Sequence, residues 1–136
     1  MNALAEFFSP LIKRQLDANR EILVTVGASQ ALDLAARAFI DPGDEILVFE
    51  PYFPAYSHFI RLSGGKLIPV PLRPEVGTTG YNSSDWTFSY QELELKINSR
   101  TKIIWLNNPN NPLGKVSLVN QFQNILISSK TTRSTH

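Results

Sequence analysis

Strand-length and helix-length apolar patterns alternate along this chain, and this alternation limits the possible folds more than any other feature. The β-rich run Ile22–Val26 leads into Gly27, and apolar residues at helical spacing then continue to Phe39. A second β-rich run begins at Glu45, after the turn sequence Asp-Pro-Gly-Asp at 41–44. The order strand, turn, helix, strand predicts parallel strands joined by crossover helices. We therefore expect an α/β fold with a mainly parallel sheet in an αβα layered arrangement.

Similar patterns predict the remaining elements. Apolar residues three and four apart from Leu4 to Leu16 predict a helix that ends near Asp17. The other expected elements are a helix over 55–62, an edge strand over 66–70 that contains Pro69, a loop over 73–87, a helix over 90–97 capped by Ser89, and a strand over 103–106 that is apolar on both faces. Val24, Leu47 and Ile104 are expected on neighbouring strands of one sheet.

Composition excludes several classes of partner. The chain has 13 Lys and Arg scattered among 12 Asp and Glu, so no basic stripe predicts nucleic-acid binding. It has no cysteine and two histidines, His58 and His136, so we expect no metal site. No apolar run approaches the roughly 18 residues of a membrane helix, and no membrane partner is expected. The first residues show no targeting pattern, which favours a cytoplasmic location, with a mitochondrial one as the alternative.

Ligands of parallel α/β sheets bind beyond the carboxyl ends of the strands, which directs attention to three segments. The first is Gly27-Ala28-Ser29-Gln30, where a predicted strand passes into a helix. Small residues there let backbone N–H groups approach a ligand, and the helix dipole favours an anion, so the segment is a candidate phosphate cup. The alternative is an ordinary helix cap.

The other two segments are rich in aromatic residues and in asparagine. Tyr52 and Phe53 lie on an elbow between two prolines, where an aromatic face can stack on a flat ring, although core packing is the alternative. Residues 107–115 contain four asparagines and two prolines, which predicts a rigid turn with side-chain amides directed off the sheet edge. Lys115 follows Gly114 on this turn and is expected to be solvated.

Four motifs in this order resemble the fold-type I pyridoxal 5'-phosphate (PLP) aminotransferases of class I/II. They are Val24–Gly27 before a helix, Asp41–Glu45, Glu50–Tyr56, and Asn111–Gly114 after an apolar strand. The match runs from about Leu4 to Val116. Three further stretches, Ser84–Phe88, Ser99–Lys102 and Asn108–Val116, resemble the kynurenine aminotransferase branch, also called glutamine transaminase K or cysteine-S-conjugate β-lyase.

The resemblance implies PLP as cofactor and assigns roles to five positions. Ala28 and Ser29 would bind the PLP phosphate, and Phe53 would stack on the pyridine ring. Asn111 would donate a hydrogen bond to the phenolic oxygen and lie near the substrate carboxylate, and Tyr56 would line the substrate site. The implied reaction moves an amino group from an aromatic or sulfur-containing amino acid, of kynurenine type, or from glutamine, to a 2-oxo acid. The family forms homodimers.

Several family residues have no counterpart in the chain, among them the Schiff-base lysine, so no catalytic residue is assigned. We expect residues 1–116 to be part of the large PLP-binding domain of a truncated enzyme that is inactive by itself. Residues 117–136 are expected to be a divergent tail, disordered over 128–136. The alternative is a non-catalytic module, derived from an aminotransferase, that binds a phosphate-bearing ligand or pairs with a complete subunit.

Overall fold

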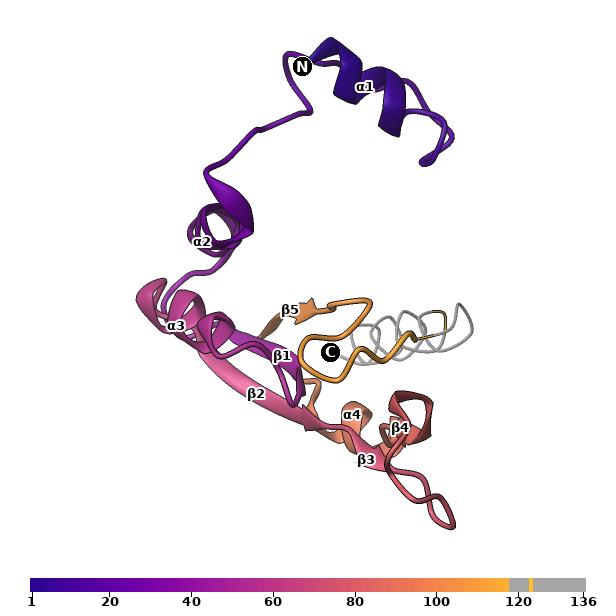
Figure 1. Ribbon diagram of the computed structural model, residues 1–136. Coiled ribbons are helices and arrows are strands. Elements are labelled where there is room, and N and C mark those ends of the chain that lie inside the picture. The colour runs from indigo at the N-terminus through magenta and orange to yellow at the C-terminus, as the bar shows by residue number, and fades with distance from the viewer. Residues whose placement is uncertain (118–122, 124–136) are drawn as a thin grey trace. The chain divides into compact units, whose positions relative to one another are not determined.

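The computed structural model describes residues 1–117 and residue 123, and the chain forms two compact units. The first unit is Met1–Ala31, and the second begins at Leu32 (Figure 1). The predicted tail over 117–136, with its disordered end at 128–136, lies outside the described residues apart from positions 117 and 123.

The first unit contains the helix α1 (Asn2–Phe8), which is shorter than predicted. The expected continuation to Leu16 is wrong. Pro10 has no backbone N–H to donate and its ring clashes with the preceding helical turn, so it is not compatible with the interior of a helix. Within α1 only Ala5 is buried, and the hydroxyl of Ser9 bonds back to its carbonyl oxygen. The Ser9 hydroxyl also accepts a hydrogen bond from the Leu16 N–H at 2.9 Å, which closes the segment after the helix.

The segment Ile22–Val26 is not a strand, contrary to the sequence prediction. Leu23, Val24 and Val26 are between 65% and 86% exposed, and no strand among the described residues pairs with them. A strand is stabilised by hydrogen bonds to a neighbouring strand, so a β-rich composition alone does not form one. Val24 therefore does not lie on a strand beside Leu47 and Ile104.

A three-stranded parallel sheet forms the centre of the second unit, with the strand order β2-β1-β5. The strands are β1 (Glu45–Glu50), β2 (Lys66–Pro71) and β5 (Thr101–Trp105). Leu47 pairs with Ile68 on one side and with Ile104 on the other. β2 is an edge strand, as Pro69 predicted. Figure 1 shows β1 and β2 running side by side.

Three helices precede or connect these strands in the sequence. α2 (Gly27–Phe39) starts in the first unit and ends in the second, α3 (Ala55–Leu62) joins β1 to β2, and α4 (Tyr90–Lys96) precedes β5. All three were predicted to within one residue. The Ser89 side chain accepts a hydrogen bond from the Glu92 N–H at 3.2 Å, so Ser89 is the N-cap of α4 as expected.

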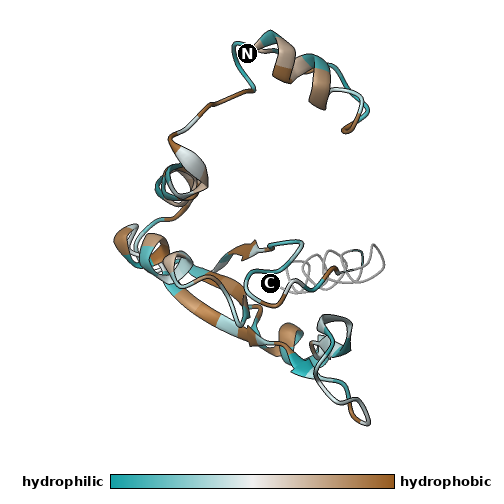
Figure 2. Cartoon of the chain, in the orientation of Figure 1, coloured by the Kyte–Doolittle hydropathy of each residue, from teal (hydrophilic) through white to brown (hydrophobic). Residues whose placement is uncertain are grey.

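Side chains of β1 alternate between two apolar clusters, one on each face of the sheet. Ile46 and Val48 pack with residues of α2 and α3, and Leu47 and Phe49 pack with residues of β2 and α4. Burying one such aliphatic side chain stabilises a fold by ~1.5–3 kcal/mol, which explains a strand that is apolar on both faces. Figure 2 shows the sheet as mainly hydrophobic. Helices cover both faces, so the second unit has the predicted αβα layers.

Part of the expected loop over 73–87 is ordered into short elements. The two-residue strands β3 (Arg73–Pro74) and β4 (Trp86–Thr87) pair in antiparallel fashion, and the 3-10 turn η1 (Ser83–Asp85) lies just before β4. The indole N–H of Trp86 donates to the Gly80 carbonyl at 3.0 Å and fixes the intervening turn. The sequence prediction missed these short elements because the contact that stabilises them comes from one side chain and not from a periodic pattern.

A buried carboxylate ties together the amino ends of the three strands. The Glu45 side chain is 4% exposed and accepts hydrogen bonds from Asn98 Nδ2 at 2.8 Å and Arg100 Nε at 3.0 Å, with Lys66 Nζ at 3.4 Å. The hydrogen bond from Asn98 contributes most to lowering the pKa of Glu45, and burial of the carboxylate opposes this effect. These contacts therefore stabilise the amino end of the sheet. Ligands of parallel α/β sheets bind at the opposite end, beyond the carboxyl ends of the strands.

Candidate functional site

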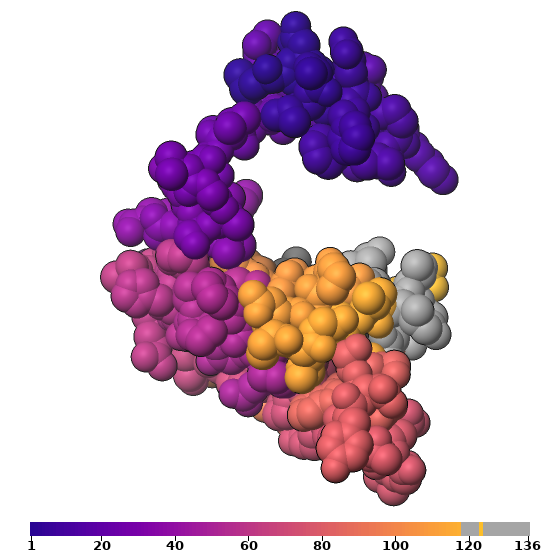
Figure 3. All heavy atoms as spheres, in the orientation of Figure 1, coloured from indigo at the N-terminus to yellow at the C-terminus, as the bar shows by residue number. Residues whose placement is uncertain are grey.

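The carboxyl ends of β1 and β5 carry the elbow and the asparagine-rich turn that the sequence singled out. The elbow over 51–54 continues directly into α3, because the Tyr56 N–H donates to the Phe53 carbonyl at 3.0 Å. The segment after β5, coloured orange, lies at the surface of the second unit in Figure 3. Asn110 of the turn is hydrogen-bonded to Pro51 of the elbow, although the two residues are 59 positions apart in the sequence. The parallel pairing of β1 with β5 brings the two segments to the same edge of the sheet.

Aromatic side chains form a cluster behind the elbow. The Tyr56 ring centroid lies 5.2 Å from that of Trp105, 5.8 Å from Phe53 and 6.4 Å from Tyr52. Tyr56 is 6% exposed and belongs to the core, whereas Phe53 is 38% exposed. Burial raises the pKa of the Tyr56 phenol. Phe53 therefore presents an accessible ring that is supported from behind by Tyr56, whereas Tyr52 is half-buried against the core. The stacking of Phe53 on a flat ring stays a prediction.

Asn110 connects the turn to the elbow, and the sequence analysis gave it no role. Its side-chain amide donates to the Pro51 carbonyl at 3.3 Å, while its Oδ1 accepts from the Leu113 N–H at 3.1 Å. Its backbone N–H donates to the Lys115 carbonyl at 2.8 Å, and its carbonyl accepts from the Gly114 N–H at 2.7 Å. The tendency of asparagine to bond backbone groups a few residues ahead could have indicated this role.

The expectation that the asparagine amides point off the sheet edge is only partly correct. Asn108 exchanges hydrogen bonds with the backbone of Ser117, at 2.8 Å and 3.4 Å, so it closes the turn as Asn110 does. Asn111 is exposed, and none of the described residues bonds to its side chain. Within the second unit, Phe53 and Asn111 thus lie on the two segments that Asn110 connects.

Ala28 and Ser29 lie in the first turn of α2, within the first unit. Both are exposed, and the Ser29 hydroxyl has no hydrogen-bond partner among the described residues. Gly27 has a φ of +72°, which favours glycine, and a Cβ placed on it would meet nothing within 4 Å. The first turn contains no acidic residue that would repel an anion. The arrangement therefore fits a phosphate group, and it is also the geometry of an ordinary helix start.

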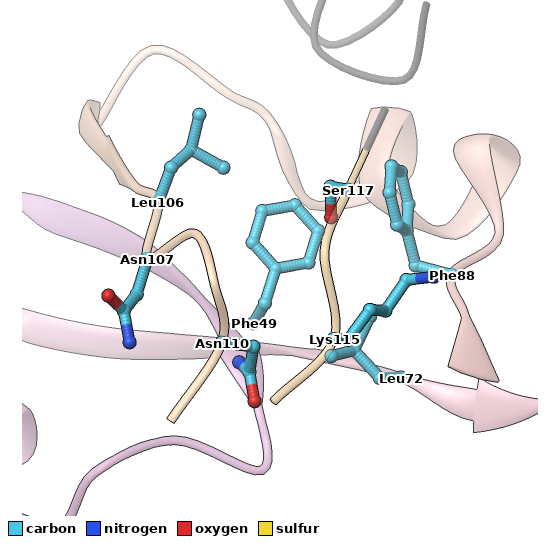
Figure 4. A pocket seen from close by; sticks show the side chains of 8 residues that line it. All are labelled: Phe49, Leu72, Phe88, Leu106, Asn107, Asn110, Lys115 and Ser117. Carbon is cyan, nitrogen blue, oxygen red and sulfur yellow. The ribbon is translucent and has the colours of Figure 1, made fainter. Parts of the chain in front are cut away.

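A cavity of about 20 Å³ lies where the strands end, on the face of the sheet that carries Phe49. The lining side chains, shown in Figure 4, are those of Phe49, Leu72, Phe88, Leu106, Asn107, Asn110, Lys115 and Ser117. Lys115 is 5% exposed, so the prediction that it would be solvated on the turn is wrong. The hydrogen bond between the Asn110 N–H and the Lys115 carbonyl turns the chain back toward the apolar side chains of Phe49, Leu72 and Phe88.

A parallel sheet with helices on both faces defines an αβα protein. In such proteins ligands bind beyond the carboxyl ends of the strands, where this chain has its polar turns. A family model for aminotransferase class I and II matches residues 1–133. Human kynurenine–oxoglutarate transaminase 3 is 45% identical over 117 residues, which are 85% of this chain and 26% of the relative. The chain belongs to the aminotransferase class I and II family.

Solved structures agree with this assignment. The crystal structure of Bna3p from Saccharomyces cerevisiae has a TM-score of 0.84 and 32% identity, over 95% of this chain and 31% of that one. Cystalysin from Treponema denticola, whose structure contains a pyridoxal 5'-phosphate cofactor, has a TM-score of 0.76 at 22% identity, over 96% and 32%, and shows the shared fold alone. The fold is that of fold-type I aminotransferases, and the chain spans about a quarter of the length of the human relative.

Within residues 1–117 and position 123, no helix combines the length and the apolar character needed to cross a bilayer.

Proposed function

We propose that the protein to which this segment belongs is a PLP-dependent aminotransferase, and that the segment supplies part of the cofactor's binding surface. The observation that supports this most is family membership combined with exposed groups at the expected cofactor positions. Ser29, Phe53 and Asn111 all present side chains to solvent. When bound, PLP supplies an electron sink for the carbon atom that loses the amino group.

The first turn of α2 would hold the phosphate. The N–H groups of Ala28 and Ser29 point out of the start of the helix, and the Ser29 hydroxyl adds a third donor. Hydrogen bonds from neutral donors to an ionised phosphate are stronger than those between neutral groups, by roughly a factor of two. These residues would therefore fix the position of the cofactor without taking part in proton transfer.

Phe53 and Asn111 would orient the ring. Phe53 offers an exposed aromatic face whose tilt is set by Tyr56 behind it, at 5.8 Å between centroids. The Asn111 amide would donate to the phenolic oxygen of the cofactor, and a fixed donor favours the ionised form of that oxygen. Asn110, bonded to Pro51, would keep these two side chains at a constant separation. Tyr56 is also proposed to line the substrate site, as the family resemblance implies, and from its buried position it supports the Phe53 ring as well.

For the whole protein we propose that the amino donor is an aromatic or sulfur-containing amino acid, of kynurenine type, or glutamine. The proposed acceptor of the amino group is a 2-oxo acid. The human relative is named a kynurenine–oxoglutarate transaminase, which supports this class. A homodimer is proposed as the working assembly, on the basis of the family resemblance. By itself the 136-residue chain is expected to give no turnover, because the Schiff-base lysine of the family has no counterpart among its matching positions.

Binding of pyridoxamine 5'-phosphate to the 136-residue chain, measured by calorimetry, tests the site. This ligand carries the same phosphate and ring but has no aldehyde to react with surface lysines. We expect Ser29→Ala, Phe53→Ala and Asn111→Ala each to weaken binding about tenfold, which corresponds to ~1.4 kcal/mol. Tyr81→Ala is the matched control for Phe53, because Tyr81 is 92% exposed on another loop. Equal losses for Tyr81→Ala and Phe53→Ala would refute the site.

The activity requires a second experiment on the protein that carries this segment. Transamination of kynurenine with a 2-oxo acid should fall in kcat/KM when Phe53 or Asn111 is replaced by alanine. Unchanged activity in both variants would refute the roles of these two residues. Binding of pyridoxamine 5'-phosphate without turnover toward any amino donor would favour the alternative, a non-catalytic module that holds a phosphate-bearing ligand.

A further inference from the structure

Asn111 lies exposed on a turn whose two ends are joined by backbone hydrogen bonds. The Asn110 N–H donates to the Lys115 carbonyl at 2.8 Å, and the Gly114 N–H donates to the Asn110 carbonyl at 2.7 Å. The Asn110 side chain also accepts a hydrogen bond from the Leu113 N–H at 3.1 Å. These bonds fix the shape of the turn, but a turn of fixed shape can still tilt as a whole. Its attachment to the rest of the second unit therefore decides where Asn111 lies.

Three attachments hold this turn. The Asn110 amide donates to the Pro51 carbonyl at 3.3 Å, which is long for such a bond. Leu113 is half-buried and packs against the apolar cluster around Phe49. Lys115, on the other side of the turn's glycine, is 5% exposed. The third attachment is the unusual one, because a lysine side chain is rarely buried unless it is paired.

The burial of Lys115 is not explained by a polar partner. Neither a salt bridge nor a side-chain hydrogen bond joins it to another residue of 1–117 or 123. No fully enclosed side-chain nitrogen or oxygen in this part of the chain lacks a partner, so the ammonium group is not fully enclosed. A lysine can lay its methylene stem along apolar surface while its ammonium group stays in contact with water. Burial of Lys115 therefore provides apolar contact through the stem.

The surroundings of Lys115 fit this role. Leu72 and Phe88 line the same cavity as Lys115, and both are buried members of the cluster that Leu113 joins. Figure 4 shows the Lys115 side chain extending from the turn toward these two residues. The cavity of about 20 Å³ has room for roughly one water molecule. Such a small space beside the stem leaves it little freedom to move.

We propose that Lys115 is a positioning residue for Asn111, and that it acts through the packing of its stem and not through its charge. The stem holds the turn against the apolar cluster. The hydrogen bond between the Lys115 carbonyl and the Asn110 N–H passes this constraint to the residue next to Asn111. The Asn111 amide then stays where it can donate to the phenolic oxygen of the cofactor. This inference rests on the proposed function and adds to it a residue that acts only through Asn111.

Two substitutions separate the stem from the charge. Lys115→Met keeps an unbranched chain and removes the ammonium group, whereas Lys115→Ala removes both. In calorimetry on the 136-residue chain, Lys115→Ala should weaken pyridoxamine 5'-phosphate binding about fivefold, and Lys115→Met less than about twofold, because only the first loosens the turn. Equal losses in the two variants, or no loss in Lys115→Ala, would overturn the proposal.

A shorter apolar side chain guards against loss of folding in Lys115→Ala. Lys115→Val removes the charge and only part of the stem, so its loss of affinity should lie between those of the methionine and alanine variants. A loss in Lys115→Val no greater than that in Lys115→Met would contradict a role of the stem.

A double-mutant cycle tests whether Lys115 acts through Asn111. In a chain that already carries Asn111→Ala, Lys115→Ala should weaken binding by less than about twofold more, because the group that it positions is gone. In a chain that carries Ser29→Ala, which changes the proposed phosphate contact, Lys115→Ala should still cost about fivefold. A merely structural role, such as partial unfolding, would give the full loss in both backgrounds and would refute the inference.

The outcomes also separate this inference from the proposed function. If Asn111→Ala leaves binding unchanged, the proposed role of Asn111 fails, and that of Lys115 fails with it. If Asn111→Ala weakens binding but Lys115→Ala does not, only the role of Lys115 fails. The matched control is Lys102→Ala, which removes a lysine side chain that is 47% exposed on β5. It should change binding by less than about twofold, because an exposed ion pair contributes little.

Discussion

Replacing Glu45 by glutamine should destabilise the sheet measurably. The glutamine has nearly the same volume, but it offers one neutral oxygen where the carboxylate accepts hydrogen bonds from Asn98, Arg100 and Lys66. A hydrogen bond to a charged, buried group contributes ~1.5–3 kcal/mol. The side chains of Arg100 and Lys66 are 67% exposed, so water replaces most of what they lose. We expect a loss of about 2 kcal/mol in the free energy of unfolding.

Urea denaturation of the wild-type chain and of Glu45→Gln measures this loss. With a slope of ~2 kcal/mol per M urea, the midpoint should fall by about 1 M. The matched control is Glu92→Gln, which removes a carboxylate that is 29% exposed and paired with Arg73, and its midpoint should shift less. A shift for Glu92→Gln as large as that for Glu45→Gln would refute the assigned role of burial.

The pH dependence has a definite sign. The pKa of Glu45 is lowered from its ordinary value of 4.5, chiefly by the hydrogen bond from Asn98. The carboxylate therefore contributes stability that is fully present above pH 4.5 and is lost as the pH falls through the lower pKa of the folded state. The difference between the wild-type chain and Glu45→Gln should shrink on acidification below about pH 4.5. A difference independent of pH in this range would contradict the mechanism.

Three further outcomes follow from particular contacts. Gly65→Ala should lower stability by ~1–3 kcal/mol in thermal or urea unfolding, because its Cβ would lie 2.6 Å from Ile40 Cγ2 and 2.8 Å from Ile46 Cδ1. Ile46→Val, which removes Cδ1, should partly rescue it. Asn110→Ala should weaken pyridoxamine 5'-phosphate binding more than Asn108→Ala, as measured by calorimetry, since Asn110 bonds to the elbow and Asn108 bonds within the turn; equal effects would refute the positioning role. In an absorbance titration, the difference between the wild-type chain and Tyr56→Phe should show ionisation of one phenol above pH 10, because burial raises the pKa of Tyr56, and a transition at or below pH 10 would contradict it.

The second unit could be predicted from sequence because its elements depend on neighbouring residues. Periodicity placed α3 and β1, the capping pattern placed α4, and Pro69 indicated the sheet edge. The helix predicted to reach Leu16 was wrong for a reason that could have been read from the sequence, since Pro10 interrupts it.

Other features depend on residues far apart in the chain. The run Ile22–Val26 has a strand composition, but a strand forms only where a second strand accepts its hydrogen bonds. Lys115 is buried, and it lines the same cavity as Phe49, Leu72 and Phe88, which come from three other segments. The roles proposed for Ala28, Ser29, Phe53 and Asn111 came from family resemblance, and local pattern alone would have left each with a structural alternative.

The strand pairings of the central sheet differ in the length of chain that each must close during folding. Glu45 pairs with Lys66 through the short connection of α3, whereas its partner in β5, Thr101, lies more than twice as far along the chain. Each doubling of a flexible loop adds ~0.6 kcal/mol of entropic cost, and contacts close in sequence form faster. The β1-α3-β2 crossover is therefore the expected folding nucleus, and β5 joins it later. The turn bearing Asn111 follows β5, so it would be ordered only in the last step of assembly.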